Sequence, residues 1–183
     1  MVPGERPTSP WIRFGGVKSV ILIGMPGSGK STVGVLLAKR LRRGFVDTDL
    51  VIQERDGRAL QEILDSEGPQ GFIAREESIL RDYVPQGEVV ATGGSVVYSE
   101  SLMRHFSSHG LVVFLDVSAA VLLPRLSNLD TRGVVRRGGQ TVEELWDERD
   151  PLYRQWADVS IDNSMEDHES VVEAIASLPQ LRD

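Results

Sequence analysis

The chain has 183 residues, of which 40% are hydrophobic and 26% charged, and its net charge is −7, so we expect one soluble globular domain rather than a nucleic-acid binder. The absence of cysteine excludes disulfides and thiolate metal sites, and three histidines without a cluster argue against a structural zinc site. No run approaches the ~20 apolar residues of a membrane span, so we expect a cytoplasmic protein without membrane contact.

The first residues are expected to lie outside the folded domain. Pro3, Pro7 and Pro10 interrupt this stretch, which also lacks the apolar core of a signal peptide. We therefore expect a flexible extension over residues 1–16 and a single domain over residues 17–183.

Short apolar runs alternate with helical spacings along the rest of the chain. The run at 17–23 is short, mostly apolar and bounded by glycines, which is typical of a strand buried on both faces. In chain order we expect a strand at 17–23, a helix at 30–42, a strand at 44–47, helices at 50–55, 59–66 and 71–83, a strand at 88–92, a helix at 99–108, a strand at 111–115, helices at 118–126 and 141–156, a strand at 158–161 and a helix at 169–178.

Local signals define several helix ends. Ser99 is the expected N-cap of its helix, and Thr141 and Glu144 have the spacing of a capping box. Pro151 lacks a backbone donor, so we expect the last long helix to break near Arg149. Residues 127–140 hold glycine and charged side chains with little apolar content, and we interpret them as a mobile lid loop.

Strands that alternate with helices predict an α/β fold with a parallel sheet. Ligands of such sheets bind at the carboxyl ends of the strands. The motifs described next begin at those ends.

The sequence from Gly24 to Ser31 fits G-x-x-x-x-G-K-[ST], and it lies between an expected strand and an expected helix. In this motif backbone N–H groups and the helix N-terminus bind phosphate oxygens. Lys30 is expected to reach the β- and γ-phosphates and Ser31 to bind Mg²⁺. The expected ATP-binding residues of the loop are Met25, Pro26, Gly27, Ser28, Gly29, Lys30, Ser31 and Thr32.

Two carboxylates follow the second strand. Asp47 is expected to hold a water bound to Mg²⁺, and Asp49 to face a substrate hydroxyl. The alternative is that Asp49 caps the next helix. The third strand ends without a carboxylate, which leaves Asp47 as the candidate for Mg²⁺. Gly93 and Gly94 follow that third strand and permit close approach of a ligand, although an ordinary turn is the alternative.

Arginines gather in the second half of the chain. Arg132, Arg136 and Arg137 lie in the expected lid, where an arginine could stabilise the transferred phosphoryl group, or could be solvated. Arg149 could bind a substrate carboxylate in bidentate fashion, or pair with Glu148 or Asp150 on a helix surface.

Together these residues resemble the shikimate kinase family over about residues 20–161. The P-loop is common to many kinases. The F-x-D-x-D stretch at 45–49, the A-T-G-G turn at 91–94 and the R-x-P-L-Y stretch at 149–153 are more specific.

The resemblance implies transfer of phosphate from ATP, with Mg²⁺, to the 3-hydroxyl of shikimate in the chorismate pathway to aromatic amino acids. It also implies a three-layer P-loop kinase fold like that of nucleoside monophosphate kinases, with a five-stranded parallel sheet in the order 2-3-1-4-5, helices on both faces and a lid. Asp49 would contact the shikimate hydroxyls and act as the base. The resemblance further implies that Arg149 binds the shikimate carboxylate and that Glu76, Gly93 and Gly94 belong to the shikimate site. Arg132 would contact the γ-phosphate, and Arg125 would pack on adenine.

The chain departs from the family at several positions. In the family pattern G-E-x-x-F-R, the arginine binds the substrate carboxylate. In this chain Pro69 replaces the glutamate of the pattern and Ile73 replaces the arginine. Arg75 is expected to point elsewhere, because two helical positions correspond to about 200°. Ser95 replaces a family glycine, and Gly133 replaces a proline after the lid arginine. Arg136 or Arg137 could supply the missing positive charge.

Three readings remain open from the sequence. The first is a shikimate kinase, either fully active or weak, that works as a monomer. The second is a kinase of another small hydroxylated substrate such as gluconate. The third is a nucleotide-binding protein without turnover.

Overall fold

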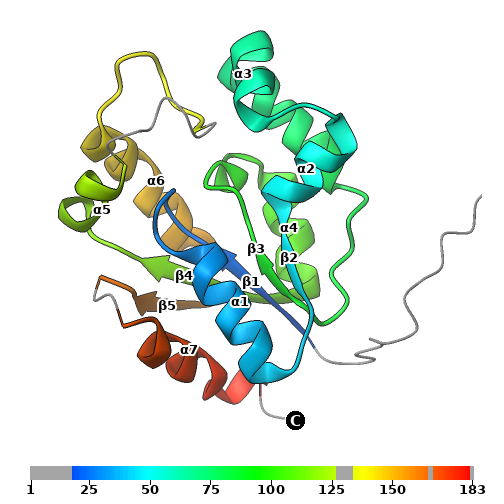
Figure 1. Ribbon diagram of the computed structural model, residues 1–183, viewed down its shortest axis with the longest axis vertical. Coiled ribbons are helices and arrows are strands. Elements are labelled where there is room, and N and C mark those ends of the chain that lie inside the picture. Colours follow the sequence, from blue (N-terminus) through cyan, green and yellow to red (C-terminus); the bar gives the residue numbers. More distant parts are fainter. Residues whose placement is uncertain (1–17, 127–133, 165–166, 182–183) are drawn as a thin grey trace, which may run out of the picture.

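The computed structural model describes residues 18–126, 134–164 and 167–181 (Figure 1). The expected extension at 1–16 lies outside these residues, as do residues 127–133 of the expected lid with Arg132. No helix in the described ranges has the length and hydropathy needed to cross a membrane.

Within the described residues, five parallel strands form one sheet in the order β2-β3-β1-β4-β5, which confirms the expected strand order. Ile21 of the central strand is in register with Val90 on one side and with Val112 on the other. The strands are β1 (Ser19–Ile23), β2 (Phe45–Asp47), β3 (Val89–Ala91), β4 (Gly110–Asp116) and β5 (Val159–Asp162).

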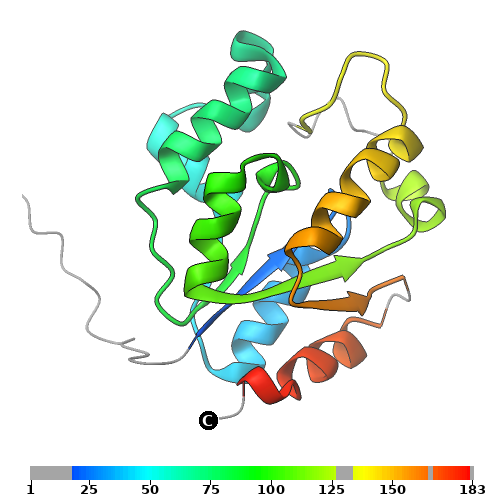
Figure 2. The same ribbon diagram turned by 180° about the vertical axis from the view of Figure 1, so that it is seen from behind.

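Helices cover both faces of the sheet, so the fold has three layers (Figures 1 and 2). The helices α1 and α7 pack on one face, and α4 and α6 cover the other. The α-helices are α1 (Lys30–Leu41), α2 (Thr48–Asp56), α3 (Leu60–Leu80), α4 (Glu100–His109), α5 (Ala119–Arg125), α6 (Val142–Trp156) and α7 (His168–Ala176). Short 3-10 turns occupy Val96–Tyr98 and Pro179–Leu181.

Alternate side chains of β1 belong to two different cores. Val20 and Leu22 pack with α1 and α7, whereas Ile21 and Ile23 pack with residues of α3, α4 and α6. Every residue of β1 is buried, as expected for a strand that is covered on both faces. The two cores therefore fix the sheet, and the carboxyl ends of its strands meet at one edge.

The helix α3 joins two segments that the sequence predicted as separate helices at 59–66 and 71–83. The chain kinks at Gly68, where φ is 69° and ψ is 178°, and Pro69 begins the second segment. A positive φ suits glycine, and proline suits a first helical position because it needs no backbone donor there. The kink therefore takes the place of the expected loop.

Pro151 does not break α6, contrary to the sequence prediction. The helix runs without interruption from Val142 to Trp156, with Pro151 inside it. The missing donor would have bonded the carbonyl of Asp147, an exposed residue at which water can replace the lost bond. The predicted capping box of Thr141 and Glu144 is confirmed. Ser99 caps α4 as expected, with a bond from the Leu102 amide.

Candidate active site

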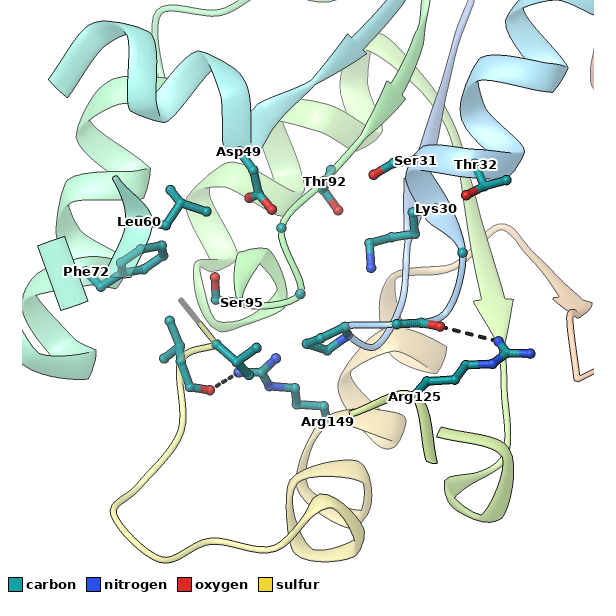
Figure 3. Close-up of a pocket in the computed structure, with 17 residues that line it drawn as sticks. Lys30, Ser31, Thr32, Asp49, Leu60, Phe72, Thr92, Ser95, Arg125 and Arg149 are labelled. Carbon is teal, nitrogen blue, oxygen red and sulfur yellow. Dashed lines mark hydrogen bonds between the residues drawn. The ribbon is translucent and has the colours of Figure 1, made fainter. Parts of the chain in front are cut away.

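A cavity of about 590 Å³ opens at the carboxyl ends of β1 and β3 (Figure 3). The loop before α1 forms one wall, and Gly93 and Gly94 after β3 form another. Figure 3 shows Lys30, Asp49 and Arg149 pointing into the common space from three different elements. The remaining lining residues are Pro26, Gly27, Gly29, Ser31, Thr32, Leu60, Phe72, Thr92, Ser95, Arg125, Val134 and Val135.

The loop between β1 and α1 has the backbone of a phosphate-binding loop. Gly29 has a φ of 91° and immediately precedes the first residue of α1, so the positive end of the helix dipole faces the cavity. Asn163, which is fully buried, donates a side-chain hydrogen bond of 2.6 Å to the Ser28 carbonyl and braces the loop from behind. A Cβ on Gly29 would lie 2.9 Å from Asn163 Nδ2, so a side chain at this position would displace the brace.

Lys30 is buried and directed at the loop. Its Nζ donates hydrogen bonds of 2.8 Å to the carbonyls of both Gly24 and Met25. Burial lowers the pKa of Lys30 to about 8, and the neighbouring carboxylates of Asp49 and Asp47 oppose this shift. The ammonium group therefore lies where a phosphate could exchange with the two carbonyls.

Asp47 links the starts of two helices. Ser31 Oγ donates a hydrogen bond of 2.7 Å to Asp47 Oδ2, and Asp47 Oδ1 accepts the backbone N–H of Asp49 at 3.0 Å. Asp47 is thus the N-cap of α2, and the alternative that Asp49 caps this helix is wrong. A serine hydroxyl beside a carboxylate supplies the hard oxygen donors that Mg²⁺ prefers, so these residues fit the expected metal.

Asp49 extends into the cavity from the first turn of α2. Burial raises the pKa of its carboxyl to about 6, with repulsion from Asp47 acting in the same direction and the charge of Lys30 against it. A carboxylate with a pKa near neutrality is suited to accept a proton from a hydroxyl. The role of Asp49 as the base stays a prediction.

Arg149 is fully buried on α6. Its Nε donates a hydrogen bond of 3.1 Å to the Tyr98 hydroxyl, its guanidinium carbon lies 5.0 Å from the centre of the Tyr98 ring, and its Nη2 donates to the Val135 carbonyl. The alternative of a surface ion pair is wrong, because Glu148 pairs with Arg137 and Asp150 with Arg154. The guanidinium therefore faces the cavity as a donor group for an anion.

Gly94 is needed for this position of Arg149. A Cβ on Gly94 would lie 3.0 Å from Arg149 Nη1 and 2.8 Å from Cδ of Pro26. The Tyr153 hydroxyl also donates a hydrogen bond of 2.6 Å to the Gly94 carbonyl, which fixes the turn against α6. Gly93 and Gly94 thus bring the turn close to both the phosphate loop and the arginine, which an ordinary surface turn would not do.

Arg125 and the lid arginines occupy different surroundings. Arg125 lines the cavity at the end of α5, and its Nη1 donates to the Gly27 carbonyl at 3.4 Å. Arg136 donates to the Gln140 carbonyl at 2.8 Å, and neither Arg136 nor Arg137 lines the main cavity. Both instead line a second cavity of about 270 Å³, together with Ile73. The proposal that one of them replaces a cation at Ile73 stays a prediction.

Three further residues from the sequence analysis lie outside the main cavity. Met25 is buried in the hydrophobic core, and Ser28 is buried with its Oγ 3.5 Å from Lys30 Nζ. Arg75 forms ion pairs with Asp56 and Glu67, which confirms that it points away from the cavity.

Glu76 lies behind the cavity wall rather than on it. Its side chain is 1% exposed, and Oγ of Ser95, which does line the cavity, lies at a hydrogen-bonding distance of 2.9 Å from Glu76 Oε2. Burial raises the pKa of Glu76 to about 8, and the charge of Asp49 adds to this shift. Ser95 therefore stands between Glu76 and the cavity, and a contact of Glu76 with a substrate stays a prediction.

Several site residues were not singled out from the sequence. Phe72, Leu60 and Val135 supply apolar parts of the wall, and Asn163, directly after β5, donates a hydrogen bond to the loop. Phe72 belongs to a quoted family pattern, which could have pointed to it. No local pattern marks Asn163, because its role depends on the contact between β5 and the loop.

The sheet has the strand order 2-3-1-4-5, and one wall of the cavity is a phosphate loop with its lysine. The other wall carries a carboxylate and a buried arginine. These features define a P-loop kinase that acts on a small molecule. Comparison with known proteins identifies the family. The family model described as shikimate kinase matches residues 26–179, and the chain belongs to the shikimate kinase family.

Individual relatives agree with this assignment. The chain is 38% identical to a shikimate kinase of Vibrio parahaemolyticus over 147 residues, which cover 79% of this chain and 86% of the relative. It is also 38% identical to that of Thiobacillus denitrificans over 149 residues, which cover 80% of this chain and 81% of the relative.

Solved structures show the same likeness. Shikimate kinase from Acinetobacter baumannii in complex with shikimate has a TM-score of 0.80 at 29% identity, covering 87% of this chain and 91% of that one. Shikimate kinase from Aquifex aeolicus has a TM-score of 0.73 at 32% identity, covering 86% and 93%.

Proposed function

We propose that this chain is a shikimate kinase, which transfers the γ-phosphoryl group of ATP to the 3-hydroxyl of shikimate. The observation that carries the proposal is the arrangement of Lys30, Asp49 and Arg149 around one cavity. These side chains provide a phosphate-binding cation, a base and an anchor for a carboxylate. Membership of the family supports the choice of substrate.

The nucleotide would bind along the loop before α1. The backbone N–H groups of this loop and the N-terminus of α1 would hold the phosphates, and Lys30 would exchange its two carbonyl partners for phosphate oxygens. Arg125, at the Gly27 end of the cavity, would pack against adenine. Ser31 and Asp47 would hold Mg²⁺, directly and through water respectively, and the ion would neutralise phosphate charge.

The acceptor would bind on the opposite wall. Arg149 would hold the carboxylate of shikimate in bidentate fashion, with Gly93 and Gly94 beneath the ring. The O–H bond of the substrate breaks as its proton passes to Asp49, a new O–P bond forms, and the bond to the β-phosphate oxygen breaks with release of ADP. The enzyme contributes mainly by positioning the reactants and by stabilising charge.

Two parts of the proposal rest on the family resemblance or on general considerations. Arg132, outside the described residues, would close over the γ-phosphate and exclude water. That the enzyme works as a monomer in the cytoplasm stays a prediction.

The test is ADP release measured with a coupled assay in the presence of Mg²⁺ and ATP, with shikimate or gluconate as the acceptor. We expect turnover with shikimate only, abolished by Asp49→Ala and retained by the control Asp65→Ala, a change at an exposed position of α3. Turnover with gluconate alone would identify a different substrate. ATP binding without turnover of either compound would overturn the proposed reaction and point to the loss of an arginine at Ile73.

A further inference from the structure

Ser95 and Glu76 form a buried pair on the substrate side of the cavity. Ser95 is 5% exposed and lines the cavity near Asp49 and Phe72, as Figure 3 shows. Its Oγ lies 2.9 Å from Oε2 of Glu76, which is 1% exposed. Ser95 caps no helix with its side chain, so this contact is not explained by a local structural need.

The other oxygen of Glu76 is buried and has no hydrogen-bond partner among the described residues. This Oε1 atom lies 2.9 Å from the position that a Cβ would take on Gly93, and Oδ1 of Asp49 lies 2.8 Å from the same position. Two carboxyl groups therefore approach Gly93 together. An ionised carboxylate with one of its two oxygens unpaired is disfavoured at such a buried position.

The charged groups around Glu76 oppose one another. Burial and the charge of Asp49 raise its pKa, whereas the hydrogen bond from Ser95 and the charge of Arg149 lower it, and the net result is a pKa of about 8. Tyr153 also interacts with Glu76, and burial raises the pKa of this phenol to about 12, so it remains neutral near pH 7. Burial therefore favours the neutral, protonated form of Glu76 near pH 7.

The protonation state of Glu76 decides whether the Ser95 hydroxyl can donate a hydrogen bond to a ligand in the cavity. Beside an ionised Glu76, Ser95 must donate its proton backwards and can offer only lone pairs to a ligand. A neutral Glu76 can donate its own proton to Ser95 Oγ, which leaves the serine proton available for the cavity. The two states therefore favour opposite hydrogen-bonding partners.

We propose that Ser95 is a substrate-contacting residue and that Glu76, through its 2.9 Å contact with Ser95, is the positioning residue, so that Ser95 donates a hydrogen bond to a substrate hydroxyl next to the one that Asp49 deprotonates. The inference rests on the proposed function. Because Ser95 stands where the family resemblance implies a glycine, this contact belongs to this chain's own site.

Removing the serine hydroxyl tests the contact. With Ser95→Ala we expect the KM for shikimate to rise about tenfold, while the KM for ATP changes less than twofold. Glu77→Gln is the matched control, because Glu77 neighbours Glu76 and accepts a similar hydrogen bond, of 2.7 Å, from Ser99 outside the cavity. An unchanged KM for shikimate in Ser95→Ala would overturn the proposal.

Variants of Glu76 test the direction of the hydrogen bond. Glu76→Gln keeps a neutral donor, so we expect its kcat/KM at pH 7 to stay within about threefold of wild type. Glu76→Ala should behave like Ser95→Ala, and the double variant should lose little more than either single variant. Above pH 8 the KM of wild type should rise while that of Glu76→Gln stays flat. Equal losses in Glu76→Gln and Glu76→Ala would show that an ionised carboxylate is required.

Failure of this inference can be told apart from failure of the proposed function. Turnover of shikimate by wild type decides the function, and if shikimate binds without turnover, the dissociation constant replaces KM in the comparisons above. Absence of shikimate binding would overturn both proposals. Melting temperatures add a test without substrate: wild type should lose stability relative to Glu76→Gln as pH rises through about 8. A constant difference between pH 7 and 9 would contradict a neutral Glu76.

Discussion

Ser31 Oγ and Asp47 Oδ2 lie 2.7 Å apart although 16 positions separate the two residues along the chain. The same carboxylate accepts the backbone N–H of Asp49 and caps α2. Asp47 therefore serves both the first turn of α1, where we place Mg²⁺, and the helix that carries the proposed base.

Asp47→Asn is expected to separate these two roles. The amide oxygen can still accept the Asp49 N–H, so the melting temperature should change little, whereas the loss of charge should raise the Mg²⁺ concentration needed for half-maximal rate about tenfold. Asp47→Ala should also lose the cap, at about 1 kcal/mol of stability. Mg²⁺ titration of ADP release and thermal melting measure the two effects. Wild-type Mg²⁺ dependence in Asp47→Asn would contradict the proposed metal role.

Lys30→Met is expected to lower kcat at least about 100-fold, because the methionine keeps the length of the side chain but lacks the charge that stabilises the transferred phosphoryl group. ADP release with saturating shikimate measures the effect. Lys39→Met, on the exposed side of the same helix, is the control and should keep wild-type kcat. A loss of less than threefold in Lys30→Met would argue against its role in the transfer.

Asp49 should impose an acid limb on the pH profile. Since the pKa of its carboxyl is raised to about 6, kcat/KM should fall about tenfold for each pH unit well below 6, as the base becomes protonated. A profile that is flat from pH 5 to 8 would exclude Asp49 as the base.

The raised pKa of Asp49 also predicts that ionisation of this carboxyl, which activity requires, lowers the stability of the folded protein. A carboxyl whose pKa is raised in the folded state contributes stability at low pH that is lost as pH rises through about 6. Asp49→Asn, which cannot ionise, should therefore be inactive but more stable than wild type at pH 7, by on the order of 2 kcal/mol. Chemical denaturation at pH 5 and pH 7 measures this, and the difference between the two proteins should shrink at pH 5.

Arg149→Lys is expected to raise the KM for shikimate at least about tenfold, because lysine cannot form the two parallel hydrogen bonds of a guanidinium with a carboxylate. The KM for ATP should change less than twofold. Arg154→Lys, on the same helix and paired with Asp116 and Asp150, is the control. Equal increases in both variants would indicate a general disturbance of α6 rather than a lost substrate contact.

Much of the fold could be predicted from the sequence because its signals are local. The alternation of apolar runs and helical spacings located the five strands, and the P-loop glycines fixed the turn before Lys30. Predictions that needed only neighbouring residues, such as the capping box at Thr141 and Glu144, agree with the structure. The strand order was implied by the family resemblance rather than by these patterns.

The remaining features depend on contacts between distant segments. Pro151 predicted a broken helix from its own chemistry alone, but the packing of Leu145 and Tyr153 on either side of it holds α6 against the core. The sequence left open whether Arg149 was solvated, and the contacts with Tyr98 and Val135 decide this. The position of Glu76 behind Ser95 likewise follows from how α3 packs against the turn after β3, which no local pattern records.

The bond between Arg149 and the Val135 carbonyl has a consequence for inhibitor chemistry. The guanidinium already donates to an uncharged oxygen, so the anchor in this cavity can be satisfied without a negative charge. A carboxamide in place of an acid would lose the strength of a charged pair but would also avoid the cost of stripping water from a carboxylate. Uncharged compounds that copy this peptide carbonyl are therefore reasonable starting points for ligands of the cavity.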